Sequence, residues 1–234
     1  MCGRQSIEHL QSVLAQMMQD IKSSTEEIAL NITKVLTIYS KYQEDVHSLL
    51  LQQTVKQQMH VYIQNILTQC KYADGAGFAS HIEEKDYWIL EWWFKHNTNH
   101  QQHYLEVDQG TQQRLDFTTF EWFEQTAKTK QTYIHGPYVD YVCTSNTAYT
   151  ITTAHPIFFQ NQFLGVAVVD LLVSTLERFI LPALTRITFR IAITNADGRI
   201  LISNDAKLRT GSILKAPIKL IFQDKAHPFK ILVL

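Results

Sequence analysis

Residues 149–159, YTITTAHPIFF, and residues 163–170, FLGVAVVD, decide how the fold is interpreted. Both runs are rich in β-branched and aromatic residues, which favour extended strands. The residues between them, Gln160, Asn161 and Gln162, are polar and have a length typical of a hairpin loop. The sequence therefore predicts two adjacent strands joined by a short turn.

Other β-rich runs and short helices surround this pair. Asp197-Gly198 lies between two apolar, β-branched runs, which is a strong hairpin signal. Helices are predicted at residues 120–129 and 171–180, the second ending near Pro182 because proline breaks helical hydrogen bonding. The further strands predicted from composition cover residues 87–94, 189–194, 200–202 and 229–234.

The stretch from Ser6 to Cys70 has a helical pattern, without proline or glycine. Ser23 and Ser24 are followed three residues later by Glu26 and Glu27, the arrangement of a capping box, so a new helix is predicted to start there. We expect two or three helices, at least one of them long. Their apolar stripes, which would form core or a dimer seam, are Ile7, Leu10, Leu14, Met17 and Ile21, then Ile28, Ile32, Val35 and Ile38, then Leu51, Val55, Met59, Ile63 and Ile66.

Gly75 and Gly77 mark the change from the helical to the β-rich part. Glycines at this point indicate a tight turn or a close approach of backbone. The run lacks the third glycine and the lysine that dinucleotide and phosphate loops use. We predict a structural turn here and no phosphate site.

Composition limits the function classes. The chain has 234 residues, 45% hydrophobic and 18% charged, and a formal net charge of -1, which argues against nucleic-acid binding as the main role. No apolar window of membrane-spanning length is present, and the first residues lack the layout of a secretory signal. The cysteines, Cys2, Cys70 and Cys143, are few and far apart, which favours reduced thiols and a cytoplasmic location.

The same signals predict a division of the chain into three parts. Residues 1–70 form an N-terminal helical segment, and residues 71–184 form the main β-containing module. Residues 185–234 are too few for a second domain with a large core of its own, so a truncated module is expected there.

Five motifs follow one another in a definite order. They are EWF at residues 121–123, GPYVD at 136–140, TAHP at 153–156, GVAVVD at 165–170 and ITNADGRILISND at 193–205. In this order they resemble double Cache (PDC) domains, the sensor domains of chemoreceptors and histidine kinases. The resemblance implies an α+β fold in which long N-terminal helices pack on a PAS-like antiparallel sheet, followed by a reduced second Cache-like β-unit.

The resemblance also implies a ligand site. In the amino-acid-binding branch of the family, an arginine, a tryptophan and a tyrosine hold the ligand carboxylate, while a tyrosine and two aspartates hold the amino group. Residue by residue, Trp122, Tyr138, Asp140 and Asp170 match this pattern. Aromatic residues complete the predicted ligand-binding set, which is Trp122, Tyr138, Asp140, Asp170, Phe120 and Phe123.

Two departures from the family pattern change the expected ligand. Phe120 stands where the family has its arginine, and Leu115 replaces an upstream tyrosine. A ligand carboxylate needs a fixed cationic group to offset its desolvation, whereas an ammonium needs carboxylates and aromatic faces. We therefore predict a cationic amine such as a biogenic amine or polyamine. The alternative is an amino acid whose carboxylate is held by Arg114.

Each site residue also has a purely structural interpretation. Trp122 can be a core residue, and Asp170 can cap a helix that starts near Ser174. Asp140 can be a turn residue, and Tyr138, which follows Gly136-Pro137, can mark a loop. The ligand-site hypothesis depends on the order and spacing of the four residues together.

Other chemistry is weaker in this sequence. His96, His100 and His103 would share one face of a helix and could bind a metal, but the surrounding residues favour a polar loop, so no metal site is predicted. Glu121 and Glu124 are expected on an exposed helix face. His155 is expected to be a hydrogen-bonded wall residue, that is, a residue of a strand that lines the module, rather than a catalytic base. No nucleophile elbow or zinc-protease motif occurs, so we predict no enzyme and no cofactor.

These observations lead to a small-molecule sensor that binds an amine or an amino-acid-like ligand and signals to a separate output partner by a ligand-induced conformational shift. We expect no nucleic-acid partner and no membrane insertion, and a possible homodimer through the N-terminal helices. The alternative is a helical interaction or scaffold protein whose β-module binds no ligand.

Overall fold

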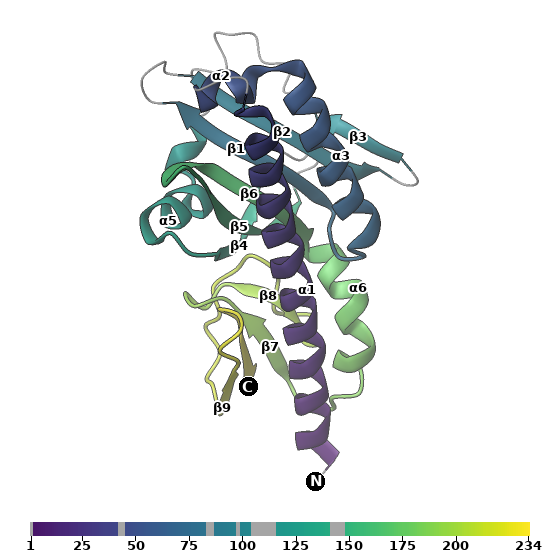
Figure 1. The fold of residues 1–234 in the computed structure, drawn as a ribbon. Coiled ribbons are helices and arrows are strands. Elements are labelled where there is room, and N and C mark those ends of the chain that lie inside the picture. The colour runs from purple at the N-terminus through teal and green to yellow at the C-terminus, as the bar shows by residue number, and fades with distance from the viewer. Residues whose placement is uncertain (1, 42–44, 83–86, 97–98, 104–115, 141–147) are drawn as a thin grey trace. The chain divides into compact units, whose positions relative to one another are not determined.

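The computed structural model describes residues 2–41, 45–82, 87–96, 99–103, 116–140 and 148–234 (Figure 1). The helices are α1 (Cys2–Tyr39), α2 (Val46–Leu51), α3 (Gln53–Gln69), the 3-10 turn η2 (Phe117–Thr119), α5 (Glu121–Thr129) and α6 (Val173–Leu184). The strands are β1 (Gly75–Ile82), β2 (Tyr87–His96), β3 (Asn99–His103), β4 (Tyr133–Val139), β5 (Tyr149–Phe159), β6 (Gln162–Leu172), β7 (Ile191–Thr194), β8 (Ile200–Ser203), β9 (Leu220–Gln223) and β10 (Lys230–Val233).

The strands form two sheets. One has six strands in the order β3-β2-β1-β6-β5-β4, and the other has four in the order β8-β7-β10-β9. The registers that the structure gives are all antiparallel. With the helices, these sheets confirm the predicted α+β class.

The chain folds into two compact units. The central unit comprises Ile21–Tyr133 and Thr152–Asp170, and the terminal unit comprises Met1–Asp20, Ile134–Ile151 and Leu171–Leu234. In the central unit α3 packs on β1 and β2, and in the terminal unit α6 packs on β8. The predicted division into a helical segment, a ligand-binding module and a truncated module stays a prediction.

The long N-terminal helix is confirmed, but the predicted restart at Ser23 and Ser24 is wrong. Helix α1 continues through both residues. Ile21, Thr25 and Ile28 are all buried and keep the same helical stripe facing the core. The Thr25 hydroxyl donates to the Ile21 carbonyl at 2.8 Å, so this polar side chain is satisfied within the helix. The capping-box residues therefore lie in the interior of one helix.

The hairpin predicted at residues 160–162 is confirmed. Gln160 and Asn161 both have positive φ, at 50° and 64°, and connect β5 to β6. The predicted hairpin at Asp197-Gly198 is confirmed as β7 and β8, and the last strand as β10. Local turn chemistry and strand composition were sufficient at these places.

The predicted turn at Gly75 and Gly77 is wrong, since both residues lie inside β1. The alternative, a close approach of neighbouring atoms, is what the structure contains. A Cβ on Gly77 would lie 2.4 Å from the Glu91 carbonyl oxygen and 2.7 Å from Trp92 Cε3. Gly77 is therefore required by the packing of β1 against β2.

The polar loop predicted around His96 and His100 is also wrong, because these residues lie in the β2–β3 hairpin. Their side chains lie outside the described residues. Pairing with β2 outweighs the weak strand propensity of this segment. Helix α6 ends at Leu184, two residues beyond Pro182, so the proline removes one helical hydrogen bond without ending the helix at that point.

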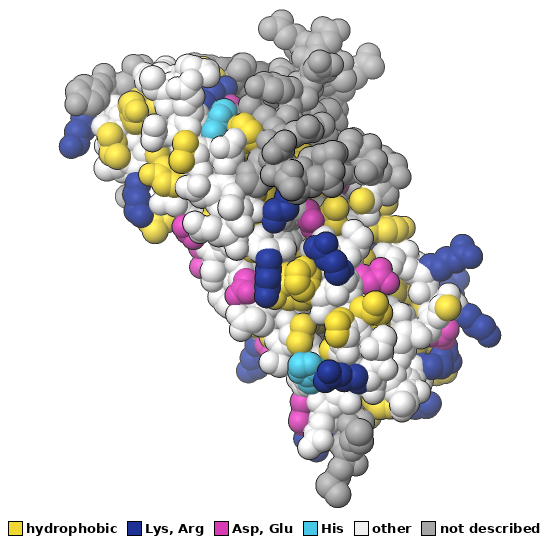
Figure 2. All heavy atoms as spheres, turned by 90° about the vertical axis from the view of Figure 1, so that its right-hand side faces the viewer, with side chains coloured by type: hydrophobic (Ala, Val, Ile, Leu, Met, Phe, Trp, Pro, Cys, Tyr) yellow, Lys and Arg dark blue, Asp and Glu magenta, His cyan; other side chains and the backbone are white. Residues whose placement is uncertain are grey.

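Among the helices that the structure describes, none has the length and apolar character needed to cross a bilayer. On the face drawn in Figure 2, Lys and Arg side chains are spread among acidic and hydrophobic ones. This distribution agrees with the low net charge of the chain.

Candidate functional site

The six-stranded sheet, which we call the central sheet, has two chemically different faces where β1, β2 and β6 lie side by side. Successive side chains of a strand point to opposite faces, and directly paired residues share a face. Gly77 pairs with Trp92, and Gly75 pairs with both Phe94 and Asp170. We call this the glycine face, defined by Gly75, Gly77, Trp92, Phe94 and Asp170.

The opposite face lies against helix α3. We call it the helix-covered face, defined by Ala76, Phe78, Glu91, Trp93 and Val169. Here the His60 ring lies edge-on to Trp93, with the ring centroids 5.1 Å apart. The two faces thus alternate along β2.

Asp170 is fully buried on the glycine face, near the end of β6. The Thr152 hydroxyl donates to its Oδ1 at 2.7 Å. A Cβ on Gly75 would lie 3.2 Å from Asp170 Oδ2 and 2.9 Å from Phe94 Cε1. Because Gly75 has no side chain, a carboxylate and an aromatic ring can come close together above the sheet.

The alternative role for Asp170, a helix cap, is wrong. The N-cap of α6 is Leu172, and the cap makes no side-chain hydrogen bond. Asp170 also fixes the backbone beside the site, because its carbonyl accepts from the Asp74 amide at 2.8 Å. The residue lies within the sheet.

Trp122 is buried in an aromatic cluster that α5 and the preceding turn bring together. Its ring is stacked on Phe117 at a centroid distance of 6.3 Å, and lies edge-on to Phe120 and Phe123 at 6.0 Å each. It also lies 6.2 Å from Trp92. The structure therefore brings Trp122, Phe120 and Phe123 together and connects them to the glycine face through Trp92.

Tyr138 and Asp140 belong to the terminal unit. Tyr138 lies in β4, so the loop interpretation is wrong, and its ring is 4.9 Å from that of His135. Asp140 directly follows β4 and is 4% exposed. The ligand-binding roles of these two residues, and of the other four, remain predictions.

Sequence reasoning missed Trp92, Phe94, Gly75 and Thr152 as part of this arrangement. The available signal was the alternation of residues 87–94, which predicts that Trp92 and Phe94 share one face. The partner glycines were visible as well. What connects them is the pairing register of β1 with β2, which no local pattern specifies.

Glu91 is a second buried carboxylate, on the helix-covered face. Lys56 Nζ lies 3.0 Å from its Oε1, and His60 Nε2 lies 2.6 Å from its Oε2. Burial raises the pKa of Glu91, but the hydrogen bond from His60 and the charge of Lys56 outweigh it, so that the pKa falls below its ordinary value of 4.5. This cluster joins α3 to β2.

His155 is half-buried in β5, as predicted for a hydrogen-bonded wall residue. Its Nδ1 lies 2.7 Å from the Thr132 hydroxyl. Burial is the main cause that lowers the pKa of His155, Glu26 acts against it, and Lys22 adds to it. Glu121 and Glu124 are exposed on α5, as expected. Within the described residues no group of three or more metal-ligating side chains occurs.

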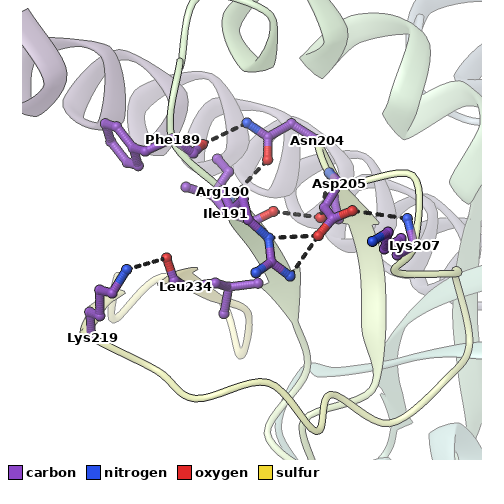
Figure 3. Close-up of polar contacts among 9 residues, drawn as sticks. Phe189, Arg190, Ile191, Asn204, Asp205, Lys207, Lys219 and Leu234 are labelled. Carbon is purple, nitrogen blue, oxygen red and sulfur yellow. Dashed lines mark hydrogen bonds and ion pairs between the residues drawn. The ribbon is translucent and has the colours of Figure 1, made fainter.

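The terminal unit contains an open cavity of about 400 Å³ lined by Arg190, Asn204, Asp205, Ala206 and Lys207. Arg190 Nε donates to Asp205 Oδ2 at 2.6 Å (Figure 3). The Lys207 amide is the main cause that lowers the pKa of Asp205, and Arg190 adds to it. The arginine is thus already paired with a carboxylate of its own chain.

Comparison with known proteins shows which family has a matching sequence and which solved structures have a similar fold. The sequence model of the family described as methyl-accepting chemotaxis protein-like, first PDC sensor domain, matches residues 34–178. No protein of curated function matches the sequence.

Solved structures share the fold. Methyl-accepting Chemotaxis protein X is 15% identical over 91% of this chain and 76% of its own, with a TM-score of 0.66. The periplasmic sensory domain of the Campylobacter jejuni chemoreceptor Tlp1 is 14% identical over 89% and 73%, with a TM-score of 0.64. The ligand-binding domain of the Pseudomonas aeruginosa PAO1 amino acid chemoreceptor PctC, in complex with GABA, is 16% identical over 100% and 96%, with a TM-score of 0.55.

Proposed function

Because the chain belongs to the family of the methyl-accepting chemotaxis protein-like, first PDC sensor domain, we propose that it senses a small cationic amine and leaves it chemically unchanged. The proposal rests mainly on the buried carboxylate of Asp170, which lies beside the Phe94 ring on the glycine face. A carboxylate next to aromatic rings is the combination that recognises an ammonium group.

The neighbouring side chains support this proposal. Thr152 holds Asp170 Oδ1 at 2.7 Å, so the carboxylate is fixed before a ligand arrives. Fixing it in advance reduces the ordering cost of binding. Trp92 and Trp122 supply the aromatic surface nearby. The resemblance to the amino-acid-binding branch implies an arginine at the position where this chain has Phe120. In this proposal the ligand has an amine and no carboxylate, so the site needs no arginine to bind a carboxylate.

Binding would act by a population shift. A ligand that orders the glycine face favours one conformation of the sensor, and a separate partner reads that conformation. Helix α3 is suited to carry such a change, because it packs on β2, the strand that carries Trp92 and Phe94. The size of the shift is limited by the difference in ligand affinity between the two conformations.

Calorimetry of the purified chain tests the proposal. We expect putrescine and ethylamine to bind, and γ-aminobutyrate and L-isoleucine to bind more weakly. At a hundredfold excess over the dissociation constant, the bound amine should add about 2.7 kcal/mol to the free energy of unfolding. Binding of none of these compounds, with no thermal shift, would favour the scaffold alternative.

Asp170→Asn sharpens the test. The amide keeps the shape of the side chain and an acceptor for Thr152 but loses the charge. We expect amine affinity to fall about 100-fold, since a buried charge-assisted hydrogen bond is lost. Glu121→Gln is the matched control, an exposed carboxylate on α5 whose replacement should leave affinity unchanged. Equal affinities of Asp170→Asn and wild type would contradict the proposal.

The second candidate is an amino-acid sensor. It is favoured by the likeness to the PctC domain, whose structure contains GABA. In that case Arg114, which lies outside the described residues, would hold the ligand carboxylate. Preference for L-isoleucine or γ-aminobutyrate over both amines, lost in Arg114→Met, would identify this function.

A further inference from the structure

Trp92 lies on the glycine face and carries a buried hydrogen-bond donor. The residue is 2% exposed, and its indole Nε1 is itself shielded from solvent. An indole nitrogen donates one hydrogen bond and accepts none. Within the part of the chain that the structure describes, no acceptor lies within hydrogen-bond distance of Trp92 Nε1. Since a buried tryptophan N–H usually has a partner, this donor is suited to an acceptor that another molecule supplies.

The indole ring of Trp92 lies over Gly77 with its six-membered ring. A Cβ on Gly77 would lie 2.7 Å from Trp92 Cε3 and 3.0 Å from Cδ2. Nε1 belongs to the five-membered ring, on the opposite edge of the indole from Cε3, so the N–H is not directed at the backbone of Gly77. The donor therefore stays available on the glycine face.

Trp92 and Asp170 occupy adjacent rows of this face. Trp92 pairs with Gly77, and Asp170 pairs with Gly75, so the intervening strand β1 contributes a glycine to each row. Residues two apart along a strand are separated by about 7 Å. The face thus carries one anionic acceptor and one neutral donor, far enough apart to contact opposite ends of one small molecule.

The neutral character of the indole N–H determines which acceptor it suits. A ligand carboxylate needs a cationic group to offset its desolvation, whereas one hydrogen bond offsets much of the desolvation of a hydroxyl, ether or carbonyl oxygen. We infer, on the basis of the proposed function, that Trp92 Nε1 donates to a neutral oxygen of the ligand whose ammonium group Asp170 binds. The ligand class narrows to amines that also carry an oxygen acceptor, as amino alcohols do.

Trp93, the next residue of β2, provides a matched comparison. It is 9% exposed, and its Nε1 also has no acceptor among the described residues. Its side chain lies on the helix-covered face, where its ring is 5.1 Å from that of His60. An indole nitrogen without a partner is therefore not sufficient by itself to indicate ligand contact. The face that Trp92 shares with Asp170 distinguishes it from Trp93.

Calorimetry on the full chain with isosteric ligand pairs is the first test. The pairs are propylamine with ethanolamine, butylamine with straight-chain propanolamine, and pentylamine with straight-chain butanolamine, which differ only in a terminal methyl or hydroxyl. An alkylamine leaves the Trp92 donor unpaired, so we expect the amino alcohol to bind about tenfold more tightly in at least one pair. Without such a donor, burial of the hydroxyl would make every amino alcohol the weaker ligand.

Trp92→Phe removes the donor and keeps an aromatic ring. We expect the affinity ratio of the preferred pair to fall from about ten to about one or below. Trp93→Phe is the matched control, the same substitution on the helix-covered face, and should keep the ratio of the wild type. Thermal melting shows whether each variant is folded.

A spectrum of the wild-type chain provides a readout that does not depend on the folding of Trp92→Phe. The chain has four tryptophans, so the indole N–H resonances of isotope-labelled protein can be assigned by single phenylalanine substitutions and elimination. Saturation with the preferred amino alcohol should move the Trp92 N–H resonance downfield, and the isosteric alkylamine should move it less. A donor that interacts with the Trp122 ring instead would respond equally to both ligands.

The outcomes separate this inference from the proposed function. Tighter binding of an amino alcohol, lost in Trp92→Phe and kept in Trp93→Phe, supports it. If amines bind and Asp170→Asn weakens them, but no amino alcohol exceeds its alkylamine, the inference is overturned and the proposed function stands. A ratio that Trp92→Phe leaves unchanged, or that Trp93→Phe reduces equally, also overturns it. If no amine of either kind binds, both fail.

Discussion

The two faces of the central sheet each contain a buried carboxylate, in opposite settings. On the helix-covered face, Glu91 lies 3.0 Å from Lys56 and 2.6 Å from His60, both on α3. On the glycine face, Asp170 is held by a neutral hydroxyl from Thr152 and lies close to the Phe94 ring.

The difference lies in the neighbours of the two carboxylates that the structure describes. Glu91 is neutralised by side chains of the same chain, so it fastens a helix to the sheet and belongs to the stability of the fold. In the function proposed above, Asp170 contributes to ligand binding instead. We therefore expect changes on the helix-covered face to affect stability, and conservative changes at Asp170 to affect binding.

The largest expected effect is a loss of stability that tests how closely β1 packs against β2 on the glycine face. Gly77→Ala would place a methyl group 2.4 Å from the Glu91 carbonyl oxygen, which is backbone and cannot move aside. We expect a loss of about 3 kcal/mol in the free energy of unfolding, measured by urea denaturation. Gly198→Ala, where nothing lies within 4 Å but φ is +78°, is the control and should cost about 1 kcal/mol. Equal losses would show that β1 and β2 are not in this close contact.

The next largest effect distinguishes the roles of Glu91 and Asp170 in stability and in binding. Glu91→Gln leaves Lys56 and His60 partly buried without their counter-charge, and should cost about 2 kcal/mol. Asp170→Asn should cost less than this, while it weakens amine binding about 100-fold. Urea denaturation and calorimetry on the same two variants measure both quantities. If Asp170→Asn is the more destabilising of the two, the assignment of roles is wrong.

The pH dependence of Glu91 follows from the direction of its pKa shift. The folded pKa lies below the ordinary 4.5, so the folded state favours the ionised form. The stability contributed by this group is therefore fully present above pH 4.5 and is lost as pH falls through the folded pKa. The stability difference between wild type and Glu91→Gln should shrink below pH 4.5. A difference that stays constant down to pH 3 would contradict the proposed ion cluster.

Much of the fold could be predicted because its signals are local. The turn at Gln160 and Asn161, helix α5 and the hairpin at Asp197-Gly198 depend on residues close together in the sequence. The predicted helix start at Ser24 was wrong because the packing of a long apolar stripe keeps the helix continuous, even though the local sequence resembles a capping box. Strands β1, β3, β4 and β9 were missed, since their strand state depends on pairing with a neighbour.

The candidate site was predictable only in part, for the same reason. Trp122 and Asp170 were identified through the order of motifs, and both are buried in the central unit. Phe94 and Gly75 were not identified, because they become neighbours of Asp170 only through the registers of β1 with β2 and β6. A sequence pattern shows which residues of one strand share a face, but not which residues of the neighbouring strand they pair with.

The smallest effect concerns His155, a half-buried group of the central unit whose pKa is lowered mainly by burial, whereas the pKa of Glu91 is lowered by its partners His60 and Lys56. The folded pKa of His155 lies below the ordinary 6.5, so the unfolded chain takes up a proton first as pH falls. The contribution of this residue is complete above pH 6.5 and declines below it. At pH 7.5, His155→Gln should cost about 1 kcal/mol through loss of the bond to Thr132.

Between pH 6.5 and 5 this cost should become smaller, because the variant lacks the proton uptake that weakens the wild type. The pKa of His227 is lowered in the same direction, mainly by burial, so some pH dependence must persist in the variant. Exposed His9→Gln serves as the control and should follow the wild type throughout. Parallel pH curves for His155→Gln and wild type would mean that folding does not lower the pKa of His155.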